Sequence, residues 1–268
     1  MPKILSDKYK PWALIVGGSE GVGEAFAHRL AAQGFNMVLT SYLAAPLERV
    51  AGDISKSSNV EIISVVHDLT TGDPLAPVTA VTDGLDIGLM IYTAGSVGPM
   101  PSFVDTPLDQ VLRPIRLNAI GQTSFAHHYG ALMKKRGGGG MIIIGSNAGM
   151  AGIGGLATYA ASKAYTQIFA EGLWMELKEH NIDVLVPVLG ATRTPFLARI
   201  GAPIDDPNFK AAYPDDIAAQ ALDRLGDGPT VLLGDSEDWR QMVEAGSRAD
   251  AVRRATARVS GLELHEGE

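Results

Sequence analysis

The sequence predicts a doubly wound α/β fold, with a seven-stranded parallel sheet and helices on both faces. Two observations support this prediction. Short apolar segments alternate with segments of helical periodicity along most of the chain, and strict alternation is typical of βαβ units with right-handed crossovers. Most of the apolar segments are continuously hydrophobic and rich in β-branched residues, as are strands buried on both faces of a sheet.

The elements follow one another in a regular order. Strands are expected at Trp12–Val16, Asn36–Thr40, Val60–Val66, Asp86–Ile91, Met141–Ile144, Asp183–Val188 and Thr230–Leu233. Amphipathic helical patterns separate them, at Gly21–Gln33, Ala45–Ser57, Pro107–Lys135, Thr158–Glu179 and Pro214–Leu225. No shift in composition marks a second domain, so residues 1–268 are expected to form one domain with a core at about 12–234. A charged extension at 235–268 carries one more helical pattern, over Arg240–Arg258.

Composition excludes several classes of protein. The chain has no cysteine, which rules out disulfides, thiolate zinc sites and cysteine nucleophiles, and no other metal site is expected. A net charge of −8 and a pI near 5.2 argue against a nucleic-acid-binding protein. The first residues contain lysines but no apolar segment, so no signal peptide is expected. The longest uncharged and mostly apolar run, at 141–162, is interrupted by glycine and polar residues, so no membrane span is expected either. The composition therefore predicts a soluble, cytoplasmic protein.

A glycine-rich turn follows the first predicted strand. Gly17, Gly21 and Gly23 are spaced G-x-x-x-G-x-G and are followed by an amphipathic helix. Such a turn lets the backbone approach a diphosphate, and the helix N-terminus offers unpaired N–H groups. A simpler interpretation is that the glycines only end the strand tightly. A P-loop is a poorer alternative, because no Gly-Lys-Ser/Thr follows.

A second motif combines a serine, a tyrosine and a lysine. Ser146 ends a predicted strand, Tyr159 comes thirteen residues later, and Lys163 lies one helical turn beyond Tyr159. A phenol is a poor acid or base at neutral pH unless a nearby cation stabilises its phenolate. Lys163 can supply that charge, and Ser146 can hold a substrate oxygen. A tyrosine and a lysine on a helix surface would be an ordinary alternative, but it leaves the serine at the strand end unexplained.

Together these motifs resemble the short-chain dehydrogenase/reductase family, over residues from about Trp12 to about Gly234. The resemblance implies a Rossmann-like fold and a catalytic set of four residues, Asn118, Ser146, Tyr159 and Lys163. Tyr159 would donate a proton, Ser146 would orient the substrate oxygen, Lys163 would lower the Tyr159 pKa and hold the nicotinamide ribose, and Asn118 would position a water. It also implies cofactor contacts, at Gly17, Ser19, Glu20, Gly21, Val22, Gly23, Ser41, Tyr42, Asp68, Leu69, Ala94, Gly95, Tyr159, Lys163, Gly190, Thr192 and Thr194.

The resemblance implies an NAD(P)-dependent oxidoreductase that interconverts a secondary alcohol and a ketone or aldehyde by hydride transfer. Apolar residues at Met150–Leu156 and Pro195–Ile200 favour a hydrophobic substrate, aromatic or steroid-like. A different class of function stays open, namely a dinucleotide-binding sensor or regulatory module without turnover. The complete set of four catalytic residues argues against that alternative.

Some residues of the sequence favour NADP(H) as the cofactor and others oppose it. An NAD-specific site places an acidic side chain after the second strand, but Ser41 stands there in this chain. The absent carboxylate favours NADP(H). Against this, Tyr42 replaces the arginine common in NADP-using relatives, and Glu20 stands where some of them carry a basic residue. Val16, Thr93 and Leu189 also depart from the family pattern. We expect use of NADP(H) over NAD(H), with weak discrimination.

A homodimer or homotetramer is expected. In the family, the helices corresponding to Pro107–Lys135 and Thr158–Glu179 form the commonest subunit interface. Both helices carry a surplus of apolar residues, among them Phe125, Phe169, Leu173 and Trp174. Such a surplus indicates burial on more than one side.

Overall fold

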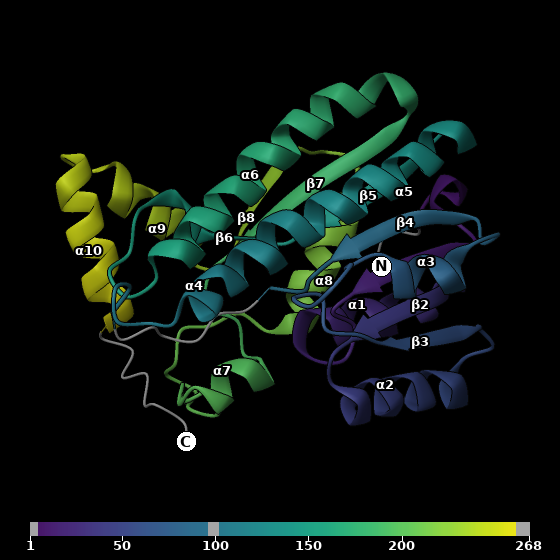
Figure 1. Ribbon diagram of the computed structural model, residues 1–268, viewed down its shortest axis with the longest axis horizontal. Coiled ribbons are helices and arrows are strands. Elements are labelled where there is room, and N and C mark those ends of the chain that lie inside the picture. Colours follow the sequence, from purple (N-terminus) through teal and green to yellow (C-terminus); the bar gives the residue numbers. More distant parts are fainter. Residues whose placement is uncertain (1–4, 96–101, 261–268) are drawn as a thin grey trace.

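The computed structural model describes residues 5–95 and 102–260. Its centre is one parallel sheet (Figure 1). From one edge the strands follow the order β3-β2-β1-β4-β5-β7, and two more strands pair with β7: β6 on the same side as β5, and β8 on the opposite side. The strands are β1 (Trp12–Val16), β2 (Asn36–Ser41), β3 (Ile62–Val66), β4 (Ile87–Tyr92), β5 (Gly139–Ile143), β6 (Gly145–Ser146), β7 (Ile182–Leu189) and β8 (Thr230–Leu233). The short β6 continues the line of β5, because both pair with β7. The predicted parallel fold is thus confirmed.

Helices cover both faces of the sheet (Figure 1). Alternate residues of each strand point to opposite faces, so in β1 Ala13 and Ile15 join one core while Leu14 and Val16 join the other. The first core is completed by α1 (Gly21–Ala31), α2 (Ala44–Ser57) and α8 (Pro214–Asp223). The second is completed by α3 (Ala76–Thr82), α5 (Gln122–Arg136) and α6 (Ala157–Leu177). Shorter elements are η1 (Asp7–Tyr9), η3 (Asn147–Met150), η4 (Lys178–His180) and α7 (Pro195–Arg199).

The long helix predicted at Pro107–Lys135 is interrupted. It consists of α4 (Leu108–Ile115), a π-helical segment, η2 (Arg116–Gly121), and α5. The Tyr92 hydroxyl enters this segment and donates to the Leu117 carbonyl at 2.7 Å. A Cβ on Gly121 would lie 2.4 Å from the same hydroxyl, so only glycine leaves room for it. Insertions of this kind are common at functional sites, and this one contains Asn118.

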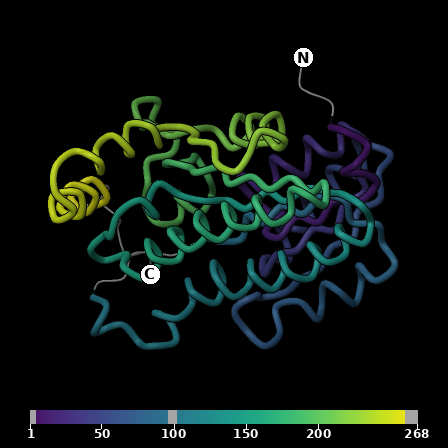
Figure 2. The backbone as a smooth tube through the Cα atoms, turned by 90° about the horizontal axis from the view of Figure 1, so that it is seen from above, coloured from purple at the N-terminus to yellow at the C-terminus, as the bar shows by residue number. Residues whose placement is uncertain are grey.

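The C-terminal extension also divides where the sequence predicts one helical pattern. It forms α9 (Ser236–Glu244) and α10 (Arg248–Ser260), separated by Gly246 at φ +81°. Figure 2 shows both helices at the end of the molecule farthest from β2 and β3. Trp239 and Ala255 pack with Ile153 and Tyr159 in a third apolar cluster. The extension therefore contacts the region of the predicted catalytic tyrosine; residues 261–268 lie outside the described residues.

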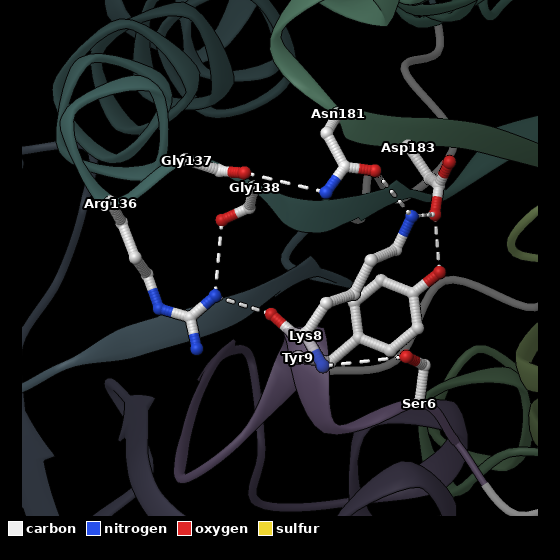
Figure 3. A network of polar contacts seen from close by, with 8 residues as sticks. All are labelled: Ser6, Lys8, Tyr9, Arg136, Gly137, Gly138, Asn181 and Asp183. Carbon is white, nitrogen blue, oxygen red and sulfur yellow. Dashed lines mark hydrogen bonds and ion pairs between the residues drawn. The ribbon is translucent and has the colours of Figure 1, made fainter.

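The N-terminal segment is held by polar contacts at the amino-terminal ends of the strands, where β7 begins (Figure 3). The Tyr9 hydroxyl donates to the Asp183 carboxylate, and the Lys8 ammonium lies 2.5 Å from the same carboxylate. The Arg136 guanidinium donates to the carbonyls of Lys8 and Gly138, the latter at 3.1 Å. These contacts connect the first helical turn, the end of α5 and the start of β7, and they leave the carboxyl ends of the strands free for the site.

Candidate active site

A cavity of about 590 Å³ opens at the carboxyl ends of the strands, which is where ligands bind in open α/β sheets. All residues expected to contact a cofactor line it, and so do Ser146, Tyr159 and Lys163. Asn118 lies outside the lining and is buried, with 1% of its surface exposed. The structure therefore brings residues from eight separate segments of the sequence to one place; these are the segments around Gly17, Ser41, Asp68, Ala94, Asn118, Ser146, Tyr159 and Gly190.

The glycine turn has no room for side chains. Gly17 has φ +98°, and a Cβ there would lie 2.7 Å from the Ala94 nitrogen. A Cβ on Gly23 would lie 1.9 Å from the Gly17 carbonyl oxygen. Within the described part of the chain, Glu20 caps the N-terminus of α1 without a side-chain hydrogen bond, so the first N–H groups of α1 remain available. The turn fits the diphosphate of a dinucleotide.

Asp68 is fixed at another part of the cavity. Its Oδ1 accepts hydrogen bonds from the Thr70 backbone N–H at 2.9 Å and the Thr70 hydroxyl at 2.7 Å. Arg113, from α4, lies 3.6 Å from Oδ2. Partial burial raises the pKa of Asp68, but the Thr70 hydrogen bonds and the Arg113 charge outweigh it and hold that pKa below its ordinary value. Asp68 is thus an ionised acceptor; sequence reasoning missed Thr70 and Arg113, which no motif marks.

Ser146 and Tyr159 meet inside the cavity. Ser146 ends β6, and its hydroxyl oxygen accepts from the Ala148 N–H at 3.2 Å. Its own proton can therefore point elsewhere, toward the Tyr159 phenol that lines the same cavity. Burial raises the pKa of Tyr159, and the hydrogen bond from Ser146 opposes this rise without cancelling it. At neutral pH the phenol consequently keeps its proton.

Lys163 lies one turn beyond Tyr159 on α6 and is buried, with 5% of its surface exposed. Its ammonium donates to the Ile144 carbonyl at 2.9 Å, between β5 and β6, and lies 5.9 Å from the centre of the Tyr159 ring. Burial lowers the pKa of Lys163 to about 8. The expected lowering of the Tyr159 pKa by Lys163 is not found in this structure, because burial disfavours the charged form of both groups.

Asn118 holds the π-helical segment against α6. Its amide nitrogen donates to the Ser162 hydroxyl at 3.0 Å, and Ser162 donates to the Tyr159 carbonyl at 2.8 Å. The amide oxygen is buried and has no hydrogen-bond partner among the described residues. A Cβ on Gly95 would lie 2.4 Å from this oxygen and 3.2 Å from Lys163 Nζ. The amide oxygen and the ammonium therefore face the same point, which suits a bridging water. Sequence reasoning missed Ser162.

The remaining surface of the cavity is largely apolar. Leu156, Phe196 and Ile200 contribute to it, as the sequence predicts for the segments around them. The C-terminal helices add Trp239, Arg258 and Val259, none of which the sequence marked. Arg258 lies 5.2 Å from the Trp239 ring and 2.6 Å from an Asp235 oxygen. The extension thus forms part of the site.

The buried ammonium of Lys163 predicts a pH dependence of stability. Between about pH 8 and 10.5 the unfolded chain still binds a proton at Lys163, while the folded chain has released it. Stability therefore rises with pH in this interval, by at most ~1.4 kcal/mol per pH unit. Urea unfolding of the wild type and Lys163→Met at pH 7.5, 8.5 and 9.5 measures it. The wild type should gain stability relative to the variant; a constant difference would contradict the prediction.

Two features are absent from residues 5–95 and 102–260: clusters of metal-ligating side chains and helices able to span a membrane. No group of three or more histidine, aspartate and glutamate side chains there is arranged to hold a metal ion. Over the same residues, no helix combines the length and hydrophobicity needed to span a bilayer.

Residues 11–204 match the family model described as short chain dehydrogenase. The 7beta-hydroxysteroid dehydrogenase of Collinsella aerofaciens is 31% identical over 244 residues, which cover 88% of this chain and 92% of that protein. A very-long-chain 3-oxoacyl-CoA reductase of Podospora anserina is 31% identical over 177 residues, which cover 65% of this chain and 52% of that protein.

Two solved structures extend the likeness to three dimensions. One comes from a study of 7beta-hydroxysteroid dehydrogenase stereoselectivity; it has a TM-score of 0.87 at 29% identity and covers 94% of this chain and 99% of the other. The second is a short-chain dehydrogenase from Sphingobium yanoikuyae in complex with NADPH, with a TM-score of 0.74 at 26% identity, covering 91% and 100% of the two chains.

Proposed function

Because the chain belongs to the short-chain dehydrogenase family, we propose that it interconverts a steroid-like secondary alcohol and its ketone. The chain is an NAD(P)-dependent oxidoreductase acting on CH–OH groups. One observation carries the choice of substrate: the cavity that holds Ser146 and Tyr159 has a largely apolar wall, to which α9 and α10 contribute. A broad, rigid hydrophobic molecule fits such a region better than a small polar alcohol.

Different residues of this chain orient the substrate and donate the proton. When bound, the nicotinamide dinucleotide supplies or accepts the hydride. In the reductive direction, the Ser146 hydroxyl donates a hydrogen bond to the carbonyl oxygen and Tyr159 gives that oxygen its phenolic proton. The raised pKa of Tyr159 keeps this proton in place at neutral pH. Ser146 therefore orients and polarises the substrate, and Tyr159 is the general acid.

The proton that Tyr159 loses is replaced from inside the protein. The unpartnered oxygen of Asn118 and the ammonium of Lys163 face one another across Gly95, and a water held between them connects Lys163 to the π-helical segment. A lysine with a pKa near 8 exchanges its proton readily at neutral pH. Lys163 also lines the cavity beside Ala94 and Gly95, where it can hold the nicotinamide ribose.

Bile-acid-like and other steroid ketones are the substrates to test first. Relatives that match most of the chain are named 7beta-hydroxysteroid dehydrogenases, and the apolar side of the cavity is built from Leu156, Phe196, Ile200 and Trp239. Of the reductases named for very-long-chain 3-oxoacyl-CoA, the one of Podospora anserina matches 65% of this chain and the one of Aspergillus clavatus matches 85%. Both substrate classes are hydrophobic ketones, so one assay can compare them.

The experiment follows the absorbance of NADPH and NADH in the presence of steroid ketones, 3-oxoacyl thioesters and small ketones such as acetone. We expect a kcat/KM for at least one steroid ketone at least 100-fold above that for acetone. Turnover of thioesters alone would replace the proposed substrate class. Cofactor binding without turnover of any ketone or alcohol would favour the alternative, a dinucleotide sensor; a Ser–Tyr–Lys set that lines the cavity has no evident use in such a module.

For the cofactor itself, we propose NADP(H) with weak discrimination against NAD(H). Ser41 ends β2 with a hydroxyl, which hydrogen-bonds to the Ser19 hydroxyl at 2.7 Å. A site without a carboxylate at this point does not repel a 2′-phosphate. The opposing charge of Glu20 is balanced by Arg199, whose guanidinium lies 2.5 Å away.

A homo-oligomer is proposed on a different set of residues from those named on sequence grounds. Phe125 is fully buried, and Phe169, Leu173 and Trp174 pack against the chain's own core, so they do not indicate an interface. Several other apolar side chains are exposed on α4, η2 and α6, namely Leu108, Ile120, Tyr165, Ile168 and Met175. Exposed apolar surface on adjoining helices is typical of subunit contacts.

Ile168→Glu is expected to weaken this association. Ile168 is 69% exposed on α6, so the free chain tolerates a charge there, whereas an apolar interface does not. Light scattering at micromolar concentration should give a multiple of 28.2 kDa for the wild type and a smaller mass for the variant. Val66→Glu, at an exposed position of β3, is the control and should keep the wild-type mass. A monomeric wild type would contradict the proposal.

A further inference from the structure

One ion pair crosses the cavity from the segment after β7 to the glycine turn. Arg199, the last residue of α7, donates from Nη1 to Glu20 Oε2 at 2.9 Å and from Nη2 to Glu20 Oε1 at 2.5 Å. Glu20 immediately precedes α1, and both residues line the cavity. A bidentate pair of this kind fixes the guanidinium in position. The cation on the glycine turn therefore comes from a distant part of the sequence.

The ion pair lies near the end of β2. Ser41 and Tyr42 line the cavity together with Glu20 and Arg199, and the Arg199 charge is close enough to interact with the Tyr42 phenol. In folds of this type the end of the second strand faces the ribose 2′ position, where an acidic residue accepts from a hydroxyl or an arginine accommodates a phosphate. Here that position has the Ser41 hydroxyl and, beside it, the Glu20–Arg199 pair.

A second arginine in the neighbourhood is already balanced. Arg49, on α2, donates to both oxygens of Glu24 at 2.8 and 2.9 Å and lies 3.7 Å from Asp53. It thus has two carboxylates and is not among the residues that line the cavity. Arg199 pairs with one carboxylate, keeps 48% of its side chain exposed and borders the cavity. Of the two, Arg199 is the one suited to an anionic ligand.

The chain holds α7 firmly enough to make Arg199 a defined part of the site. The loop that carries α7 is closed at its ends, because Arg193 donates its N–H to the Ala212 carbonyl and Ala212 donates to the Ala191 carbonyl, both at 2.9 Å. The Arg193 guanidinium donates to carbonyls inside the loop, those of Asp206 at 3.0 Å and Phe209 at 2.5 Å. The position of Arg199 is therefore set by hydrogen bonds at the base of the loop as well as by Glu20.

We propose that Arg199 recognises the 2′-phosphate of NADP(H), and that Glu20 competes with this phosphate for the guanidinium. The inference rests on the proposed binding of a nicotinamide dinucleotide in the cavity. A phosphate dianion can accept from the guanidinium fork in place of the carboxylate. When NAD(H) binds, the Glu20–Arg199 pair stays intact. The two residues therefore act in opposite directions on the choice of cofactor.

Calorimetric titration with adenosine 2′,5′-bisphosphate and adenosine 5′-monophosphate isolates the effect of the 2′-phosphate without turnover. The wild type is compared with Arg199→Gln, Glu20→Gln, Arg199→Lys and the control Arg49→Gln, and NADP⁺ and NAD⁺ are titrated in parallel. We expect Arg199→Gln to lower the affinity ratio of bisphosphate to monophosphate at least fivefold and Glu20→Gln to raise it several-fold. Arg199→Lys should keep most of the ratio, and Arg49→Gln should change it less than twofold.

The decisive result is that the affinity ratio changes in opposite directions in Arg199→Gln and Glu20→Gln. If the ion pair were merely structural, both variants would bind both ligands more weakly and by the same factor. Equal losses for the two ligands, or a ratio within twofold of the wild type in Arg199→Gln, overturn the role of Arg199 while leaving dinucleotide binding in place. A wild type that binds neither NADP⁺ nor NAD⁺ overturns the proposed function and this inference together. Thermal unfolding of each variant verifies that the domain is still folded.

Discussion

Tyr159→Phe is expected to lower kcat by ~10²–10⁴-fold, which is the contribution of a positioned general acid. The substitution removes the hydroxyl that lines the cavity with Ser146 and keeps the ring that packs against the C-terminal helices. The affinity for the dinucleotide should stay within a few-fold of the wild type, because the glycine turn and Asp68 are untouched. Steady-state kinetics with the best ketone and calorimetric binding of NADP⁺ measure the two effects.

A matched control for this variant lies on the same helix. Tyr165 is 38% exposed on α6, and its hydroxyl hydrogen-bonds to Thr123 at 2.6 Å, away from the cavity. Tyr165→Phe should leave kcat within twofold of the wild type. If Tyr159→Phe lowered kcat less than tenfold, another group would have to supply the proton.

The sequence predicted the parts of this molecule whose physical causes are local. Buried parallel strands can be recognised in the sequence as continuous apolar segments. The glycine turn can be recognised because crowding at Gly17 and Gly23 leaves no room for the side chain of any other residue. The Ser146, Tyr159 and Lys163 motif was recognisable because a strand end and one helical turn bring its members together. The glycine turn is a partial exception, because the atoms that crowd Gly17 belong to Thr93 and Ala94, far along the chain, whereas Gly23 is crowded chiefly by Gly17.

The features that the sequence did not predict depend on contacts between distant segments. The π-helical segment needs the Tyr92 hydroxyl, which arrives from β4, and a helical pattern read from Pro107 onwards gives no sign of it. Trp239 and Arg258 join the cavity because α9 and α10 fold back over η3. Arg199 reaches Glu20 across 179 positions of sequence. Periodicity records which face of a helix is buried, but not which partner covers it.

The pKa of Tyr159 also depends on contacts between distant segments. The four-residue spacing to Lys163 suggests a cation beside the phenol, and the structure does bring the ammonium to within 5.9 Å of the ring centre. It also buries Lys163 and part of Tyr159, and burial raises the pKa of Tyr159 and lowers that of Lys163. Desolvation depends on everything packed around the pair, which no spacing in the sequence encodes.

Ser146→Ala is expected to lower kcat by ~10²–10³-fold, as the loss of one donor to a developing oxyanion does. Folding should be nearly unaffected, because among the described residues the hydroxyl accepts one hydrogen bond, from the Ala148 N–H at 3.2 Å. Ser146→Thr keeps a hydroxyl and should recover part of the activity. Thermal unfolding and steady-state kinetics of the three proteins give the comparison.

The substitution also has a consequence for pH that a structural role would not produce. The hydrogen bond from Ser146 lowers the pKa of Tyr159 against the effect of burial, so its removal lets that pKa rise further. Oxidation of the alcohol requires the phenolate, and the pH at which kcat/KM for oxidation becomes half-maximal should therefore move upward in Ser146→Ala and stay near the wild-type value in Ser146→Thr. If instead Ser146→Ala unfolds at a much lower temperature and keeps its specific activity and pH profile, Ser146 is a strand-end residue and not part of the catalytic set.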